Sequence, residues 1–268
     1  MVNLKNNSVL LKHFGLLLTF LIIISCGHQK FAVSKIEGKK IGINNDPTET
    51  ADPIGIEKTK QIENFIKPYR EHINNDLSAV LAYCPETLDK SKGEWQTNIG
   101  NYLSDITYER CNLIFKNRTQ QTIDFCILNN GGIRSVIPKG NVSTKDAFEV
   151  MPFENSASVV ELKGEQVLEM INYLISEKKP HPLSRIQFTI TKENQAKDIL
   201  IQGKPLEISK SYFIVTNDYL ANGGDNMIFF KKALSRIDLD YKLRNIIIDN
   251  FKEVDTLKIN SNPRIIKE

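Results

Sequence analysis

The sequence predicts one α+β, or layered α/β, domain. Short apolar runs that suit strands are interspersed with amphipathic stretches that suit helices, so both kinds of element contribute to one core. They do not alternate regularly as strand, helix and strand, and the sequence has no internal repeat and no coiled-coil heptad pattern. This mixture without regular alternation favours an α+β, or layered α/β, fold.

The first 25 residues predict an export signal that ends in a lipid attachment site. Lys5 and Lys12 give a basic start, and the apolar run at 14–24 is too short to span a bilayer comfortably as a permanent helix. The run ends in Ser25-Cys26, which resembles a bacterial lipobox, where the cysteine is diacylated and becomes the new N-terminus. We therefore expect Cys26 to anchor the protein to a membrane, because each buried methylene contributes about 0.8 kcal/mol.

Residues 26–55 are predicted to be a tether between this anchor and the folded domain. They are polar, punctuated by prolines and without a sustained apolar period. The domain is then expected over residues 56–268. We expect an exported lipoprotein of the cell envelope that faces the periplasm. Gly27 after the cysteine is not an acidic retention signal, which slightly favours the outer membrane over the inner.

Charge, cysteine and histidine content exclude several kinds of site. Removing residues 1–25 deletes two lysines and no acids, so the net charge falls from +3 to +1, and bulk charge does not indicate a nucleic-acid partner. Cys84, Cys111 and Cys126 form an odd set in which at most one disulfide can form. The sequence has no CxxC motif, no Cys/His metal spacing and too few histidines for a two-metal phosphoesterase site, so we expect no metal ligands and no cofactor in this chain.

The individual elements are predicted from apolar spacing, in chain order. Apolar residues at helical spacing from Ile62 to Ile73 predict two helical stretches that flank a kink near Pro68. Asn98 is predicted to cap the next helix. The buried face of that helix is expected to consist of Ile99, Leu103 and Ile106. The remaining predicted elements are strands at 123–128 and 158–162, a helix at 164–176, strands at 186–191, 198–201 and 212–216, and a helix at 243–251. The inward residues of these two helices are expected to be Val167, Met170, Ile171 and Leu174 in the first and 246–248 in the second.

Three segments differ from ordinary core sequence, and the first is a glycine turn with an arginine. Asn129-Asn130-Gly131-Gly132-Ile133-Arg134 directly follows a predicted buried strand. Paired glycines let the backbone turn tightly and approach a ligand, while Arg134 brings a guanidinium that suits a phosphate or carboxylate. A purely structural turn is the alternative interpretation.

The other two segments each pair an aromatic with a polar side chain. Phe153 and Asn155 share a face of an extended segment, so a ring that stacks and an amide that hydrogen-bonds can meet one base. Tyr219 precedes the turn of Gly224 and Asp225, where the ring can stack and the carboxylate can accept hydrogen bonds from an amino group or a sugar hydroxyl. A core phenylalanine, a turn asparagine and an aspartate that caps a turn are the alternatives.

The order of these segments resembles the C-terminal domain of the 5′-nucleotidase family. Asn-Gly-Gly-Ile-Arg, then Pro-Phe-x-Asn, then an aromatic before Gly-Gly-Asp follow that family's pattern, and the resemblance covers roughly residues 60–265. It implies mixed sheets with packing helices, and a nucleobase held between Phe153 and Tyr219. It also implies contacts from Asn155 and Asp225 to base and ribose, and from Arg134 to the substrate. Gly224 belongs to the turn that brings Asp225 to the ligand.

Two departures from the family pattern concern positive charge. The family usually brings further arginines from the segment that corresponds to 88–94, which here has lysines and no arginine. Lysine lacks the bidentate fork, so anion binding is expected to be weaker or directed at another group. Arg185 stands where a glycine is common, and it can either fill part of the pocket or supply the missing charge.

The resemblance implies a protein that binds nucleotide but needs a partner to hydrolyse it. In the family an N-terminal metallophosphatase domain holds the two divalent metals, and this sequence is expected to lack that domain, with no catalytic residue of its own. We therefore expect a nucleotide-recognition component that works with a separately encoded metallophosphatase. The alternatives are a nucleoside- or nucleotide-binding lipoprotein for uptake or sensing without a hydrolytic partner, and a lipoprotein whose inherited pocket is no longer used.

Overall fold

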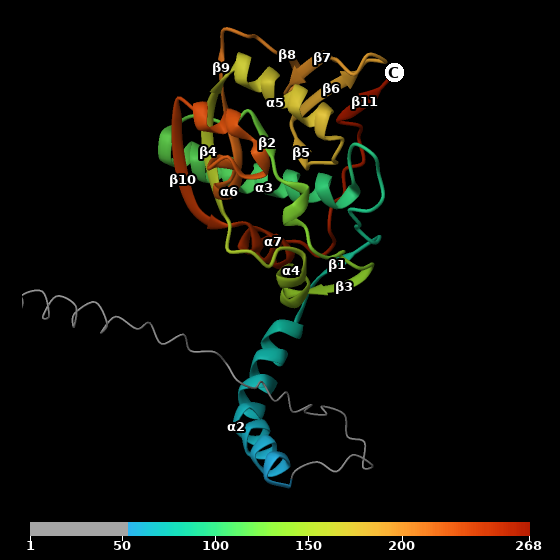
Figure 1. The fold of residues 1–268 in the computed structure, drawn as a ribbon, viewed down its shortest axis with the longest axis vertical. Helices are drawn as coiled ribbons and strands as arrows, with labels where there is room; N and C mark the ends of the chain where they lie inside the picture. The colour runs from blue at the N-terminus through green and yellow to red at the C-terminus, as the bar shows by residue number, and fades with distance from the viewer. Residues whose placement is uncertain (1–52) are drawn as a thin grey trace, which may run out of the picture. The chain divides into compact units, whose positions relative to one another are not determined.

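The structure, a computed structural model, describes residues 53–268 (Figure 1). The expected lipidation site Cys26 and almost all of the expected tether at 26–55 therefore lie outside the described residues. Contacts divide the chain between Glu63 and Asn64, and the compact unit is 64–268. Within the part that the structure describes, no helix is both long and apolar enough to cross a membrane.

The first described element is the helix α2, Pro53–Ser78. It runs through Pro68 as one helix, so the predicted separation into two stretches is wrong. A proline removes only one backbone donor, and the many other hydrogen bonds of a 26-residue helix maintain it. Its apolar side chains at helical spacing are 55–71% exposed, which defines the α2 stripe: Ile62, Phe65, Tyr69 and Ile73.

The centre of the compact unit is a mixed five-stranded sheet. Its strand order is β10-β4-β9-β2-β5, with β2 parallel to β9 and the other pairs antiparallel. The strands are β2 Phe125–Ile127, β4 Ser156–Lys163, β5 Leu183–Ser184, β9 Ser211–Asn217 and β10 Ser235–Lys242. Neighbouring residues of β4 and β9 point to two different cores, so both faces of this sheet are covered.

Helices cover the two faces and make the layers. On one side α3, Asn98–Thr119, packs with α7, Leu243–Glu253, and on the other lies α5, Gly164–Glu177 (Figure 1). The predicted inward residues of all three helices are buried except Ile248, which is half-buried. The cap of α3 is Thr97, whose Oγ accepts from the Gly100 amide at 3.1 Å, so the prediction of Asn98 is off by one.

Smaller elements complete the domain. A four-stranded sheet has the order β11-β6-β7-β8, and its strands are β6 Ile186–Ile190, β7 Ala196–Ile201, β8 Lys204–Pro205 and β11 Ile265–Lys267. A two-stranded sheet joins β1 Val80–Cys84 to β3 Gly140–Ser143. The short helices are α4 Thr144–Val150, α6 Asp218–Ala221, η1 Asn130–Gly132, η2 Gly224–Asn226 and η3 Ile228–Lys232. Mixed sheets with packing helices confirm the predicted α+β class.

The three cysteines of the domain are free, buried thiols. Cys84, Cys111 and Cys126 form no disulfide with one another. Burial in the core raises the pKa of all three, and that of Cys111 to about 12. The single disulfide that three cysteines could have formed is therefore not present among them, and packing and hydrogen bonds stabilise the fold.

Candidate functional site

The three unusual segments meet at one end of the five-stranded sheet. Because β2 and β9 are parallel, the chain leaves both at the same edge, into η1 after β2 and into α6 after β9. Strand β4 runs antiparallel to β9, and Ala157 pairs with Asn217, so the residues just before β4 lie at that edge too. The topology thus brings the segments of Arg134, of Phe153 and of Tyr219 together.

Two buried asparagines join the first and third segments. The Asn217 amide donates to Asn129 Oδ1 at 2.9 Å, and both residues are buried. The other end of the Asn217 amide accepts from the Leu220 backbone at 2.8 Å and caps α6. A satisfied buried amide pair of this kind specifies one arrangement of the two turns.

Arg134 and Phe153 lie against each other. The Arg134 backbone amide donates to Val150 O at 2.9 Å, which couples the glycine turn to the segment before β4. The guanidinium carbon lies 5.8 Å from the centre of the Phe153 ring, and that ring is 44% exposed. No carboxylate of the described residues pairs with Arg134, so its charge remains available to an anion.

Tyr219, Gly224 and Asp225 form one unit. The Tyr219 hydroxyl donates to Asp225 Oδ1 at 2.8 Å and accepts from the Asp225 amide at 3.1 Å. Gly224 lies directly against the ring, since a Cβ built there would be 2.5 Å from two ring carbons. Asp225 has a left-handed backbone with φ of 49°. The ring is held from beneath, and with 43% exposure it still presents a face to a ligand.

The segment that holds Asn155 is fixed to the start of α7. Glu154 forms ion pairs with Lys242 and Arg244, and these cations lower the pKa of its carboxyl to about 2. The Asn155 carbonyl accepts from the Leu243 amide at 3.0 Å. The backbone on either side of the half-buried Asn155 side chain is thereby set, while its amide has no protein partner among the described residues.

Sequence reasoning missed two residues of this site, Lys90 and His181. The Lys90 ammonium donates to Ile133 O at 2.5 Å, which attaches a second cation, from the segment that lacks arginine, to the backbone just before Arg134. The buried His181 accepts from the Asn130 amide at 3.4 Å through Nδ1, and its Nε2 has no partner within residues 53–268. Burial lowers the pKa of His181, which favours the neutral ring. The family pattern indicated Lys90, because Lys90 lies in the segment 88–94 where the family usually has arginines. His181 stands alone in the sequence, and no motif pointed to it.

Arg185 lies elsewhere. It lines a cavity under α3 to which none of the six predicted site residues contributes, so the structure does not place Arg185 with them. Residues 53–268 contain no group of three or more His, Cys, Asp or Glu side chains that could hold a metal ion. The guanidinium and the exposed aromatic rings of the site are chemically suited to an anion and a planar ring.

Comparisons with known proteins agree with the geometry. The sequence matches the family model described as "5′-nucleotidase, C-terminal domain" over residues 80–232. A 5′-nucleotidase of Vibrio cholerae is 25% identical over 194 residues, which cover 70% of this chain and 33% of that protein. Cell wall protein Lmo0130 of Listeria monocytogenes is 30% identical over 169 residues, which cover 57% of this chain and 21% of that protein. The chain spans a third or less of the length of these curated relatives.

Solved structures show the same fold. A 5′-nucleotidase precursor from Thermus thermophilus superposes with a TM-score of 0.65 at 22% identity, covering 79% of this chain and 43% of that one. The NAD nucleotidase of Haemophilus influenzae superposes with a TM-score of 0.55 at 16% identity, covering 78% of this chain and 42% of that one. At such identities the likeness concerns the fold.

Proposed function

This chain belongs to the family of the 5′-nucleotidase C-terminal domain, and on that basis we propose that it is the nucleotide-recognition component of a split 5′-nucleotidase or nucleotide-sugar hydrolase. It binds the nucleoside, and a separate metallophosphatase hydrolyses the phosphate ester with its own divalent metals. The observation that carries this proposal is the meeting of three segments at one end of the sheet. That end presents the exposed rings of Phe153 and Tyr219. The Arg134 guanidinium lies at the same end, and no carboxylate of residues 53–268 pairs with it. The Asp225 carboxylate and the Asn155 amide complete the set.

Each group has a chemically suitable role toward a nucleotide. Phe153 and Tyr219 stack on the base, and base stacking on an aromatic contributes about 1–3 kcal/mol per base. The Asn155 amide can donate and accept hydrogen bonds at the base, and the Asp225 carboxylate accepts hydrogen bonds from base or ribose. Arg134 meets the phosphate end, where a guanidinium can bind two oxygens at once, and the Lys90 ammonium on the neighbouring Ile133 carbonyl adds a second positive charge to this turn. Neutral His181 leaves a polar nitrogen at the floor of the same end.

The need for a partner rests on the size of the relatives and on α2. The V. cholerae 5′-nucleotidase extends beyond the matched part by about two thirds of its length. In this chain α2 precedes the matched region, which starts at residue 80, and it carries the exposed α2 stripe. A contiguous apolar stripe on a helix typically marks a protein contact. In our proposal the metallophosphatase docks on this stripe.

The location proposed for this pair is the periplasmic side of the cell envelope. Cys26 would be lipidated and residues 26–55 would tether the domain to a membrane, with the outer membrane slightly favoured. One relative is named as a cell wall protein, which fits an exported chain. Labelling cells with a palmitate analogue tests this location, since Cys26→Ala would abolish the label if the anchor is real.

The test of recognition is calorimetric titration of the full chain with AMP, adenosine and UDP-glucose. We expect binding, and a loss of roughly 5- to 150-fold in affinity for each of Phe153→Ala and Tyr219→Ala. Tyr83→Ala is the matched control, because Tyr83 is 41% exposed but belongs to β1, outside the three segments. Unchanged affinity in both site variants would refute the pocket.

The test of the split enzyme is phosphate release in the presence of Mn²⁺ or Co²⁺. The pure chain should bind nucleotide without turning it over, and a metallophosphatase from the same genome should restore hydrolysis. Replacing Phe65 and Tyr69 together by serine should then lower hydrolysis while nucleotide binding persists. Metal-dependent turnover by the pure chain would overturn the division of labour. Binding with no competent metallophosphatase in the genome would favour a role in uptake or sensing.

A further inference from the structure

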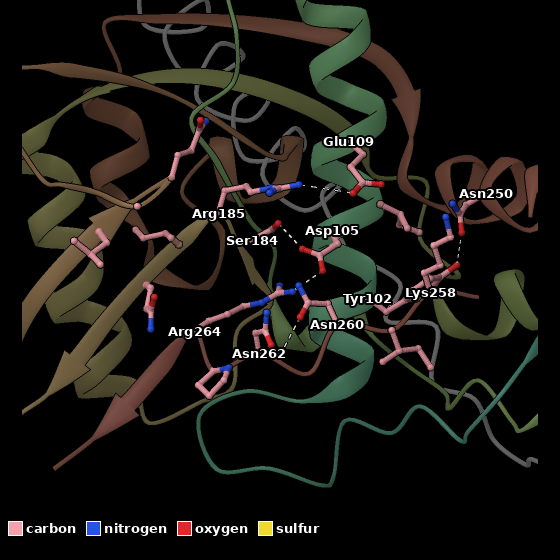
Figure 2. Close-up of a pocket in the computed structure, with 18 of the residues that line it drawn as sticks. Tyr102, Asp105, Glu109, Ser184, Arg185, Asn250, Lys258, Asn260, Asn262 and Arg264 are labelled. Carbon is pink, nitrogen blue, oxygen red and sulfur yellow. Dashed lines mark hydrogen bonds and ion pairs between the residues drawn. The ribbon is translucent and has the colours of Figure 1, made fainter. Parts of the chain in front are cut away.

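A second concave site lies under α3, away from the nucleotide end. It is a cavity of about 660 Å³ between α3, the junction of β5 and β6, and the segment 258–264 that leads into β11 (Figure 2). Its volume is within the range of small-molecule sites. None of Arg134, Phe153, Asn155 and Tyr219 lines it, so a function here is independent of nucleotide recognition.

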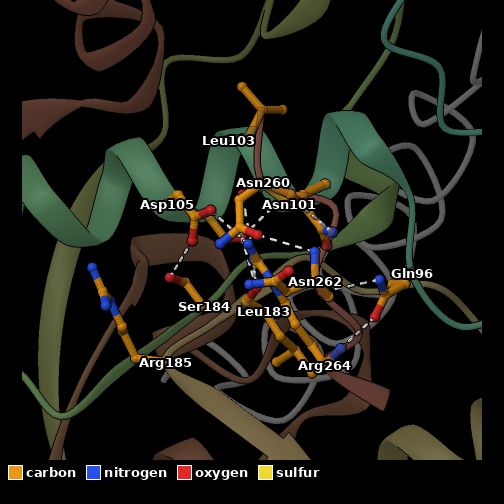
Figure 3. Close-up of polar contacts among 12 residues, drawn as sticks. Gln96, Asn101, Leu103, Asp105, Leu183, Ser184, Arg185, Asn260, Asn262 and Arg264 are labelled. Atoms are coloured by element: carbon orange, nitrogen blue, oxygen red, sulfur yellow. Dashed lines mark hydrogen bonds and ion pairs between the residues drawn. The ribbon is translucent and has the colours of Figure 1, made fainter. Parts of the chain in front are cut away.

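One wall of the cavity is fixed by the buried Arg264. Its guanidinium binds Asp105 Oδ2 at 2.5 Å, Ser104 Oγ at 3.0 Å and the Leu183 carbonyl. The Ser184 hydroxyl donates to the other Asp105 oxygen, also at 2.5 Å (Figure 3). The charges of Arg264 and Asp105 therefore compensate each other, and the wall they form is in place without a ligand.

Arg185 lines the same cavity but stands outside this network (Figure 3). Its guanidinium carbon lies 5.1 Å from the centre of the Tyr108 ring, and its one carboxylate neighbour among the described residues, Glu109, is 3.9 Å away. It donates no hydrogen bond to the described residues, and its side chain is 52% exposed. Its backbone is left-handed, with φ of 65°, a conformation that costs a non-glycine residue energy and concentrates at ligand sites.

Lys258 is the second available cation of the lining. It is exposed and has no ion pair among the described residues (Figure 2). Of the three acids that line the cavity, Asp105 is compensated by Arg264, and Glu253 is bound by Arg110 at 2.6 Å from outside the lining. Glu109, 3.9 Å from Arg185, is the remaining acid, so the two cations Arg185 and Lys258 leave the lining with a net positive charge.

The rest of the lining suits the body of a small organic molecule. Apolar surface comes from Ile106, Ile186, Leu200, Val254 and Ile259. Amide groups come from Gln187, Asn250 and Asn262. We propose that this cavity is a second binding site, for a small organic anion whose carboxylate or phosphate group is held by Arg185, while Lys258 adds positive charge to the same lining. The guanidinium binds the oxyanion through two parallel N–H groups, and the apolar wall covers the carbon skeleton.

The test uses the full chain, labelled with ¹⁵N, and titrates succinate and inorganic phosphate separately while NMR signals are recorded. The informative signals are the Arg185 Nε–H and the backbone amides of Ile186 and Ile259, which report this cavity and not the nucleotide end. We expect saturable shifts with at least one probe at concentrations up to about 10 mM. Saturation by succinate alone identifies a carboxylate ligand, and by phosphate alone a phosphate ligand.

Two variants decide whether the cations hold the probe. Arg185→Gly should weaken binding by about tenfold or more, because it removes the bidentate charged donor. This variant stays folded, since glycine adopts the left-handed backbone without strain. Lys258→Met, at an exposed position, should weaken binding by a smaller factor. Arg134→Ala at the other site should leave these signals unchanged. The proposal is overturned if neither probe saturates the signals, or if Arg185→Gly binds as tightly as the unaltered chain.

Discussion

At the open end of the five-stranded sheet, Phe153 and Tyr219 are exposed and the Arg134 guanidinium has no carboxylate partner in the described part of the chain, whereas under α3 the guanidinium of Arg264 is buried and fully engaged. The first region leaves polar and aromatic groups without protein partners, and in our proposal a nucleotide completes it. The second uses its charges to attach the C-terminal segment to the core. A polar side chain whose hydrogen bonds and charge are already matched within the fold stabilises the structure, whereas one without such partners is available to a ligand.

The comparison predicts its largest effect at Arg264. Arg264→Met leaves the Asp105 carboxylate without its buried partner, and breaking a buried pair on one side typically costs about 3–5 kcal/mol. The free energy of unfolding, measured by urea denaturation, should fall by that amount, and the melting temperature by roughly 6–20 °C.

An exposed cation three residues further on is the control for that experiment. Lys267 pairs with Glu94 at 3.1 Å, but both side chains are at least half exposed. Lys267→Met should change the free energy of unfolding by no more than about 1 kcal/mol. Equal losses in the two variants would show that Arg264 is not the structural centre we describe.

The next effect concerns the glycine beneath Tyr219. A methyl group at residue 224 would lie 2.5 Å from the Tyr219 ring and 2.6 Å from its carbonyl oxygen, so Gly224→Ala must displace the ring. Overpacking of this kind costs about 1–3 kcal/mol of unfolding free energy. Gly131→Ala is the comparison, since its methyl would meet only the Asn129 side chain at 3.6 Å. Similar stabilities of the two variants would contradict the close contact of Tyr219.

The buried His181 at the open end of the sheet should make the free energy of unfolding depend on pH. Burial lowers the pKa of His181 below its usual 6.5, so as the pH falls from about 7.5 only the unfolded chain gains this proton. Stability is thus full above the unfolded pKa and declines as the pH falls toward the folded pKa, by at most about 1.4 kcal/mol per pH unit. Unfolding of His181→Asn at pH 7.5 and 5.5 should show a smaller difference than the unaltered chain. An equal difference would mean that His181 titrates normally.

The smallest effect is expected from the Tyr219 hydroxyl. Tyr219→Phe keeps the stacking ring but removes both hydrogen bonds to Asp225. Each such bond contributes about 0.5–1.5 kcal/mol in general, and less where water can replace it at an exposed site. Nucleotide affinity should fall less than in Tyr219→Ala. A loss as large as that of the alanine variant would show that the hydroxyl, and not the ring, determines binding.

Most of the core was predictable because burial follows apolar periodicity. Strand β6 alternates buried and half-buried residues as its sequence does, and the inward face of α5 was read directly from its 3.6-residue spacing. The turns of the candidate site were also recognisable, since glycine pairs next to charged residues are unusual after a strand. Their meeting at one end depends on β2 and β9 being parallel neighbours, a pairing between distant segments that local spacing cannot reveal.

The misses have local physical causes. Strand β10, a mostly exposed edge strand, was not predicted, although Ile237, Leu239 and Tyr241 alternate with charged residues at the period of two that is typical of a strand. The cap of α3 was misplaced by one because Thr97 and Asn98 are both good cap residues, and Asn98 instead accepts from the Asp89 amide. The surroundings of His181 and Arg185 come from segments that are distant in the sequence, so local sequence patterns could not predict them.

The three buried thiols have a consequence for how the protein matures. Cys84, Cys111 and Cys126 are shielded in the core, and burial holds their pKa values too high for much thiolate at neutral pH. These residues offer nothing for a disulfide-forming enzyme to act on once the domain has folded. The same covalent domain can therefore exist in reducing and in oxidising surroundings alike, as the proposed export requires.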